Sequence, residues 1–292
     1  MKRYDNFVMG HISIDENIYQ GEAVKEIGGA VVYSSCTSYA IGYKTGILTK
    51  LSFQDKSCLE MFTIPEEDIF ALNSKNTTSI RNIYHSADRE RRTCTALSVA
   101  DSFTIDDIPK NIISQIYHFA GLIYGEFDSK MIKFLHNKGK IALDVQGFLR
   151  NVGENKEMVF KDWGKKNEYL PYIDYLKTDA AEAEIMTGTK NRKKAAEMLF
   201  GWGAKEIMIT NNKEVLIYNG KKHYTCPLKP RDLSGRTGRG DTCFSAYITE
   251  RLNKGIEEAL LFAAALVSLK IEKPGPFKGT RDDVKNYIKM HY

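Results

Sequence analysis

The amino-acid sequence predicts an α/β protein in which helices cover a mostly parallel β-sheet on both faces. From residue 115 onward, short apolar segments of strand-like composition alternate with segments of helical periodicity, which is typical of a parallel sheet. The expected strands cover residues 115–119, 140–145, 172–176 and 206–210. The expected helices cover residues 129–137, 179–186 and 193–202.

Further elements are expected on both sides of this alternation. Residues 4–9 should form the first strand, followed by a helix at 30–41 and a strand at 47–49. At the other end of the chain, the expected helices cover residues 241–253, 256–271 and 282–290. Nothing marks a linker between domains, and the 292 residues are compatible with one large α/β domain or two smaller ones.

Two polar segments between these regions indicate a separate, smaller sheet. Residues 79–84 and 93–98 have the composition of strands and are joined by the charged turn 87–92. We interpret them as an antiparallel flap outside the main core. The charges of the turn are expected to be solvated, with the alternative that one of its arginines contacts a ligand.

Composition argues against several classes of protein. The net charge of +5 arises from basic and acidic residues mixed along the chain, whereas nucleic-acid binding usually needs a concentrated basic face. The five cysteines form no C-x-x-C pair, which fits a reducing cytoplasm. No signal-peptide pattern follows Met1, and the apolar run 259–269 is shorter than the about 20 residues that cross a bilayer. A cytoplasmic protein without nucleic-acid or membrane partners is expected.

The glycine-rich loop, residues 235–240, is the strongest functional signal. It contains Gly235, Gly238 and Gly240 and leads into Asp241 and a helical pattern. Glycines allow an anion to approach the backbone, and a helix N-terminus presents free N–H groups to it. A carboxylate at that place indicates a proton acceptor. The alternative is an ordinary loop in which Asp241 caps the helix.

Polar residues also follow the expected strands, at Gly10, Asp144, Thr178 and Thr210. Because ligands of parallel sheets bind at the carboxyl ends of the strands, we expect the site there. Two nucleotide motifs are absent from the sequence. The glycine-rich loop lacks the lysine of a P-loop, and the segment after the first strand lacks the glycine spacing of a dinucleotide fingerprint.

Four segments in this order resemble the motifs of the ribokinase (PfkB) family of carbohydrate kinases. They are Gly10 to Asp15, Gly28-Gly29, Asp179 to Glu182, and Gly238 to Asp241. The resemblance spans nearly the whole chain. It implies a ribokinase-like three-layer fold, formed by one domain over 1–292 with a small β lid from about 12–27 and 77–103. It also allows a homodimer through the lid, as in several relatives.

The same resemblance implies roles for the site residues. Asp241 would be the general base, and the backbone of Gly238, Arg239, Gly240 and Asp241 would form an anion hole. The donor would be ATP with Mg²⁺, and a monovalent cation such as K⁺ is a further cofactor that the resemblance allows.

On the acceptor side, the resemblance implies that Asp15 holds two hydroxyls of a polyol. Gly28 and Gly29 would let the backbone approach the substrate ring. Tyr33 stands where many sugar kinases of this type have asparagine, which argues against ribose as the substrate.

On the donor side, Thr210 resembles a threonine close to the nucleotide. Asp179 stands where the family has asparagine, so Glu182 is the better candidate for contact with Mg²⁺ through water. Arg239 replaces the usual alanine. Asp179 and Glu182 also form a D-x-x-E pattern, which caps helices in many proteins.

Gln146 and Arg150 lie just beyond the strand that ends near Asp144, on the expected rim of the site. The guanidinium of Arg150 would pair with a phosphate or an acidic substrate, or would form a salt bridge that pins the loop. The six histidines form no ligand-spaced cluster, so a zinc site is not expected.

These observations predict a kinase that transfers the γ-phosphoryl group of ATP to a hydroxyl of a sugar or polyol. One alternative is a nucleoside kinase, in which Tyr33 or Tyr84 would stack on a base. The other is a non-catalytic sugar-binding regulator.

Overall fold

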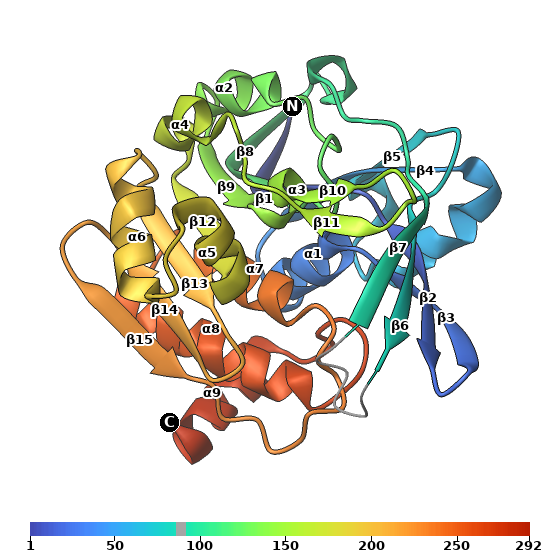
Figure 1. Ribbon diagram of the computed structural model, residues 1–292. Coiled ribbons are helices and arrows are strands. Elements are labelled where there is room, and N and C mark those ends of the chain that lie inside the picture. The colour runs from blue at the N-terminus through green and yellow to red at the C-terminus, as the bar shows by residue number, and fades with distance from the viewer. Residues whose placement is uncertain (86–91) are drawn as a thin grey trace.

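The computed structural model describes residues 1–85 and 92–292, and a large sheet lies at its centre (Figure 1). The strands of this sheet are β1 (Lys2–Met9), β4 (Thr45–Leu51), β5 (Ile69–Asn73), β8 (Ile112–Phe119), β9 (Lys140–Asp144), β12 (Tyr175–Asp179), β13 (Glu206–Thr210), β14 (Glu214–Tyr218) and β15 (His223–Pro227). Their order is β15-β14-β13-β12-β9-β8-β1-β4-β5. Neighbours from β13 to β5 are parallel, and β14 and β15 are antiparallel additions at one edge.

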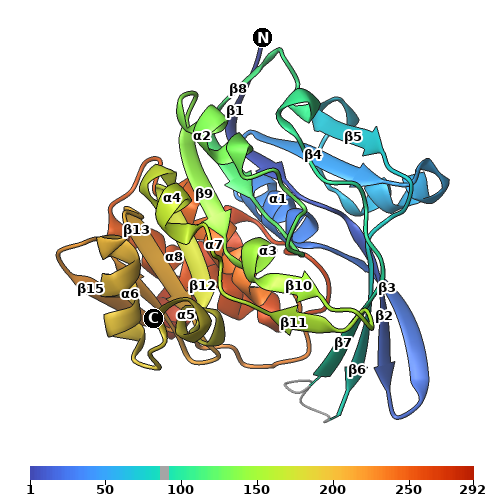
Figure 2. The same cartoon turned by 45° about the horizontal axis from the view of Figure 1, so that its top comes forward.

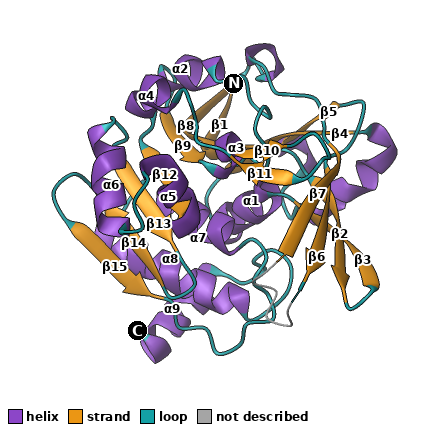
Figure 3. Cartoon of the chain, in the orientation of Figure 1, coloured by secondary structure: helices purple, strands orange, loops and turns teal. Residues whose placement is uncertain are grey.

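Helices pack on both faces of the sheet, as the alternation predicted (Figure 3). One face carries α1 (Ala30–Ala40), α7 (Arg239–Glu250), α8 (Ile256–Ile271) and α9 (Arg281–His291). The other carries α2 (Lys130–His136), α4 (Lys166–Tyr169), α5 (Ala180–Thr187) and α6 (Arg192–Gly201). Short 3-10 helices lie at Phe53–Met61, Glu66–Asp68, Ile105–Asp107 and Leu170–Tyr172.

Side chains of successive strand residues divide between the two cores. In β8, Ile116 packs in the core with α7 and α8, whereas Tyr117 belongs to the core on the opposite face. In β13, Met208 lies on the α7 and α8 side and Ile209 on the α5 and α6 side. This alternation follows from the two-residue period of a strand, and burial on both faces explains the apolar runs at the centres of β9 and β13.

A second sheet projects from the body of the protein (Figure 2). It contains β2 (Ser13–Tyr19), β3 (Glu22–Gly28), β6 (Ser79–Tyr84) and β7 (Arg92–Ser98) in the order β3-β2-β6-β7. The prediction of two polar strands at 79–84 and 93–98 is confirmed. Of the predicted charged turn 87–92, residues 87–91 lie outside the described residues.

A small antiparallel pair, β10 (Arg150–Val152) and β11 (Met158–Phe160), follows the short helix α3 (Gln146–Leu149). It touches the projecting sheet, since Thr95 of β7 forms a bridge with Glu157. The loop that carries Arg150 is thereby connected to the second sheet.

Two predicted elements are displaced. The strand expected at 172–176 is β12 at Tyr175–Asp179, because Pro171 lies in a 3-10 turn that precedes it. The helix expected from Asp241 begins at Arg239, after Gly238 as its N-cap with φ 74°. Asp241 therefore lies in the first turn of α7, and the alternative that it caps the helix is wrong.

All five cysteines are free thiols. Among the described residues, no helix is both long and apolar enough to cross a membrane.

Candidate active site

Charged side chains from two strands and two helices meet at the carboxyl edge of the sheet. β9 ends in Asp144, β12 carries Lys177, and α5 contributes Glu182. Asp241 is added by the first turn of α7. The electrostatic coupling of Lys177 to all three carboxylates places them within one cluster. The sequence predicted a site at the carboxyl ends of the strands. The structure brings Asp241 together there with the loops after Asp144 and Thr178.

The Asp241 carboxylate is held in an environment that favours its protonated form. Burial, followed by the negative charge of Asp144, raises the pKa of Asp241 to about 6, against the opposing effect of Lys177 and Lys270. Its backbone is fixed because Ser34 of α1 donates to the Asp241 carbonyl at 3.4 Å. A carboxylate with a pKa near neutrality is suited to accept a proton from a hydroxyl.

The glycines of the loop make room for neighbouring protein groups. The sequence had explained them only by the approach of an anion. A Cβ atom at Gly235 would lie 1.8 Å from the carbonyl oxygen of Lys273, and one at Gly238 would lie 2.1 Å from the ring of Tyr33. At Gly240 it would lie 3.1 Å from the ammonium of Lys177. The loop is therefore packed tightly on its inner side.

Replacing Gly238 with alanine is expected to destabilise the protein and impair the site together. The left-handed backbone alone costs about 1–2 kcal/mol, and the new methyl group must displace the Tyr33 ring. Thermal unfolding and kinase activity measure the two effects. Gly255→Ala is the matched control, since Gly255 also precedes a helix but has φ −66° and open space around it. If Gly238→Ala and Gly255→Ala lowered the melting temperature and the activity equally, the backbone and the Tyr33 contact at Gly238 would not be the cause.

Two buried lysines flank the loop, and neither was selected from the sequence. The Lys177 ammonium pairs with Asp144 at 2.8 Å, and the residue is 5% exposed. Burial disfavours this charge, but Asp144, Glu182 and Asp241 outweigh burial and raise the pKa of Lys177 above its ordinary value. Lysine is unusual in a strand buried on both faces, so Lys177 within an apolar segment was a signal that could have been noticed.

Lys270, in the last turn of α8, is the second buried cation. Its ammonium donates to the carbonyl of Gly235 at 2.7 Å and to that of Thr237. Burial lowers the pKa of Lys270 to about 8, and the charge of Asp241 opposes this shift. The sequence showed it only as a lysine at the end of an apolar helix.

Asp179 and Glu182 cap α5 reciprocally, as the D-x-x-E pattern predicts. Glu182 accepts from the Asp179 N–H at 2.7 Å, and Asp179 accepts from the Glu182 N–H at 2.8 Å. Burial, followed by the charges of Asp179 and Asp144 and against that of Lys177, raises the pKa of Glu182. Thr210 lies beside Asp179 in the register of β12 and β13.

These carboxylates do not fit a directly coordinated Mg²⁺. Asp144 is neutralised by Lys177, and Asp179 and Glu182 are engaged in the cap of α5. Within residues 1–85 and 92–292, no group of three or more histidine, cysteine, aspartate or glutamate side chains could hold a metal. Glu182 could therefore contact Mg²⁺ only through a water molecule.

The expected acceptor residues gather where the second sheet meets the main body. One oxygen of Asp15 on β2, Oδ1, is buried and has no hydrogen-bond partner among the described residues. A Cβ atom at Gly28 would lie 3.4 Å from its other oxygen. At Gly29, with φ 107°, a Cβ would meet the carbonyl of His11 at 2.5 Å, so this glycine is required by packing.

Arg150 lies close enough to Asp15 for each charge to influence the other. The residue is 5% exposed, yet no ion pair joins it to a carboxylate in the part of the chain that the structure describes. The salt bridge considered from the sequence is thus not found there. Gln146 begins α3, and its N–H donates to Asp144 at 3.1 Å.

Tyr33 lies between the two halves of the site. Its ring covers Gly238, and the Lys270 ammonium lies 4.9 Å from the ring centroid. The residue is 6% exposed. Tyr33 is therefore buried, and the glycine-rich loop and Lys270 cover its ring.

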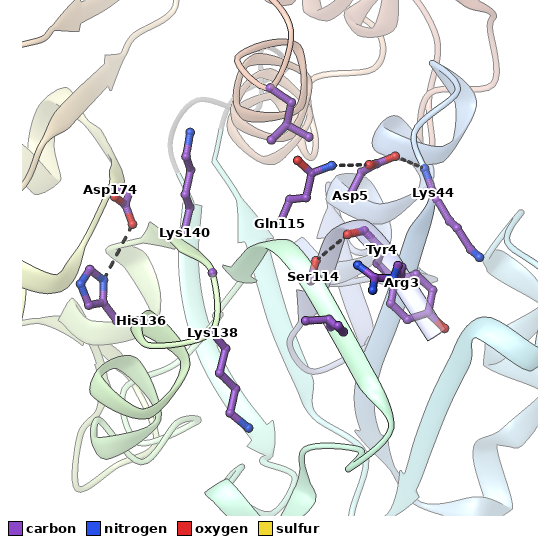
Figure 4. Close-up of a pocket in the computed structure, with 13 residues that line it drawn as sticks. Arg3, Tyr4, Asp5, Lys44, Ser114, Gln115, His136, Lys138, Lys140 and Asp174 are labelled. Carbon is purple, nitrogen blue, oxygen red and sulfur yellow. Dashed lines mark hydrogen bonds and ion pairs between the residues drawn. The ribbon is translucent and has the colours of Figure 1, made fainter. Parts of the chain in front are cut away.

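A cavity of about 910 Å³ lies at the opposite, amino edge of the sheet (Figure 4). Its lining includes Arg3, Lys44, Lys138 and Lys140, but none of the site residues predicted from the sequence. The side chains of Lys138 and Lys140 point in opposite directions (Figure 4). The cations therefore do not converge on one position, and the carboxyl edge is the better candidate for catalysis.

Comparison with known proteins assigns the fold and the reaction type. Residues 73–282 match the pfkB family of carbohydrate kinases. The chain belongs to this family. The family membership makes the protein a kinase with a hydroxyl acceptor, contrary to the alternative of a non-catalytic regulator.

Relatives of this pfkB-family kinase differ in their donors and acceptors. Cytidine kinase of Thermococcus kodakarensis is 27% identical over 260 residues, which cover 84% of this chain and 87% of the relative. A pyrophosphate-dependent kinase in the ribokinase family, solved with a pyrophosphate analog and myo-inositol, is 35% identical, with coverage of 96% and 99% and a TM-score of 0.86. Ribokinase of Arabidopsis thaliana, solved with ribose and ATP, is 17% identical, with coverage of 99% of each chain and a TM-score of 0.77. The ribokinase-like α/β fold expected from the sequence is thus confirmed.

Proposed function

We propose that this kinase transfers a phosphoryl group from pyrophosphate to a hydroxyl of a cyclic polyol of the inositol class. The observation that carries the proposal is the pair of buried ammonium groups, Lys177 and Lys270, on the inner side of the glycine-rich loop. The donor thereby differs from the ATP expected from the sequence.

The two lysines favour a small donor of high charge density. Lys177 lies against Gly240, and Lys270 lies under Gly235 and Thr237, so two positive charges are held at one short loop. In a buried setting such charges interact strongly with phosphate oxygens. Arg239 adds a further basic residue at the start of α7. The similarity of 33–35% to pyrophosphate-dependent kinases supports the same donor.

The acceptor side is suited to a neutral polyol. The unpartnered oxygen of Asp15 can accept from a hydroxyl, and the guanidinium of Arg150, with no carboxylate bound to it among the described residues, can donate to one. A nucleoside would need an aromatic surface for its base, but the ring of Tyr33 is covered by Gly238 and Lys270, and Tyr84, the other candidate, is 8% exposed. These features support a polyol over cytidine.

The proposed transfer uses this chain's residues as follows. Asp241 takes the proton of the acceptor hydroxyl as its oxygen attacks one phosphorus of pyrophosphate. The bond from that phosphorus to the bridging oxygen breaks, and inorganic phosphate leaves. Backbone N–H groups of Gly238 to Asp241 stabilise the developing negative charge, and the positive charges of the two lysines behind the loop act on it through space.

We assign the four-stranded sheet the role of a lid over the acceptor. Asp15 and Gly28 belong to it, and Thr95 of β7 is bridged to Glu157, which directly precedes β11 of the β10-β11 pair that begins at Arg150. Closure would exclude water, which otherwise competes as acceptor.

A matrix of donors and acceptors tests the proposal. Pyrophosphate and ATP are each combined with myo-inositol, ribose and cytidine, and products are identified by ³¹P NMR. We expect myo-inositol phosphate from pyrophosphate at a rate at least about tenfold above that with ATP, a difference of about 1.4 kcal/mol. Faster turnover with ATP would overturn the donor, and turnover of cytidine alone would overturn the acceptor.

A further inference from the structure

The carbonyl groups of the glycine-rich loop face a cation that belongs to the protein itself. The loop lies against the end of α8, where the Gly235 N–H donates to the Ile271 carbonyl at 2.7 Å and Ser234 donates to that of Glu272 at 3.0 Å. These bonds leave the carbonyls of Gly235 and Thr237 directed at the ammonium of Lys270.

This ammonium has a neighbour for each of its three N–H groups. Two neighbours are the loop carbonyls, and the third is the face of the Tyr33 ring at 4.9 Å. Lys270 is only 3% exposed, and no carboxylate of the described residues forms an ion pair with it. A single positive charge held by backbone carbonyls is the same arrangement with which proteins bind K⁺.

The resemblance to sugar kinases allowed K⁺ as a cofactor, but a K⁺ ion does not fit at these two carbonyls. Their oxygens already accept from Lys270, and a second cation beside the ammonium would be repelled. We infer that the Lys270 ammonium is a built-in monovalent cation of the glycine-rich loop, which holds the anion hole in shape and makes the protein independent of K⁺. The inference rests on the proposed function for its link to activity, but not for its link to stability.

The first experiment compares chloride salts at equal ionic strength. Wild-type protein should show the same activity and the same melting temperature in KCl, NaCl and choline chloride. Activation by K⁺ of about tenfold or more would overturn the inference.

The second experiment removes the ammonium. Lys270→Ala leaves a space beside two unpaired carbonyls, so its melting temperature should fall. Adding KCl or NH₄Cl, but not choline chloride, should then raise the melting temperature of this variant by about 2–4 °C and restore part of its activity. Lys270→Met fills the same space with an apolar chain and should not respond to any salt. Wild-type-like stability and activity of Lys270→Ala in choline chloride would contradict the inference.

Lys273→Ala is the matched control, because Lys273 follows three residues later and is exposed. It should behave as wild type in every salt. The melting temperatures require no donor or acceptor, so they remain decisive even if the matrix of substrates overturns pyrophosphate or myo-inositol. A response to K⁺ that is equal in Lys273→Ala and Lys270→Ala would assign the effect to general salt screening and overturn the inference.

Discussion

Replacement of Asp241 with asparagine should lower kcat by about 10²-fold to 10⁴-fold while the KM values change little, because the amide cannot accept the hydroxyl proton. The wild-type rate should fall as pH decreases through about 6, where burial and the charge of Asp144 place the pKa of Asp241, since only the deprotonated carboxylate is a base. Steady-state kinetics over a range of pH measures both effects. The acid limb should be absent from the residual activity of the variant.

Asp282→Asn is the matched control for this substitution. Asp282 also lies in the first turn of a helix, α9, but its side chain is 82% exposed and pairs with Lys285 on the surface. The control should retain full activity. If Asp241→Asn kept kcat within a factor of about two, or kept the acid limb, another group would be the base.

Replacement of Lys177 with methionine should have the second large effect. The substitution leaves the Asp144 carboxylate buried beside Glu182 and Asp241 without its counter-ion. Breaking one partner of a buried ion pair typically costs about 3–5 kcal/mol, so urea unfolding should show a loss of this size. The activity should fall as well, because a positive charge at Gly240 is removed.

The double variant Lys177→Met with Asp144→Asn should recover part of the stability, since no unpaired charge of that pair remains. Lys205→Met provides the comparison. Lys205 pairs with Asp174 at 2.7 Å but is 54% exposed, and such surface pairs contribute about 0–1 kcal/mol. Equal losses in Lys177→Met and Lys205→Met would show that the buried pair has no special role.

Local signals in the sequence were sufficient for most of the fold. The alternation of apolar segments predicted β8, β9 and β13, because strand and helix periods are visible in neighbouring residues. Pro171 and Gly238 each shifted an element by a few residues, since the turn or cap that they form depends on the backbone around them. The edge strands β14 and β15 were missed, because short segments at a sheet edge carry a weak pattern.

For the site, the sequence by itself determined the motif residues. Asp241, Asp15 and the capping pair Asp179 and Glu182 stand in recognisable patterns, and their order along the chain indicated a family of kinases that the comparisons confirm. These residues could be found because a motif is a local arrangement of residue types.

Only the tertiary structure decided what surrounds those motifs. Lys270 lies 35 residues from Gly235 in the chain, and Lys177 lies 33 residues from Asp144, so no local pattern connects either pair. The glycines that the sequence explained by the approach of an anion are also required by the Tyr33 ring and the Lys273 carbonyl. Charge and packing act through space, and the distances that set them exist only once β9, β12, α7 and α8 have come together.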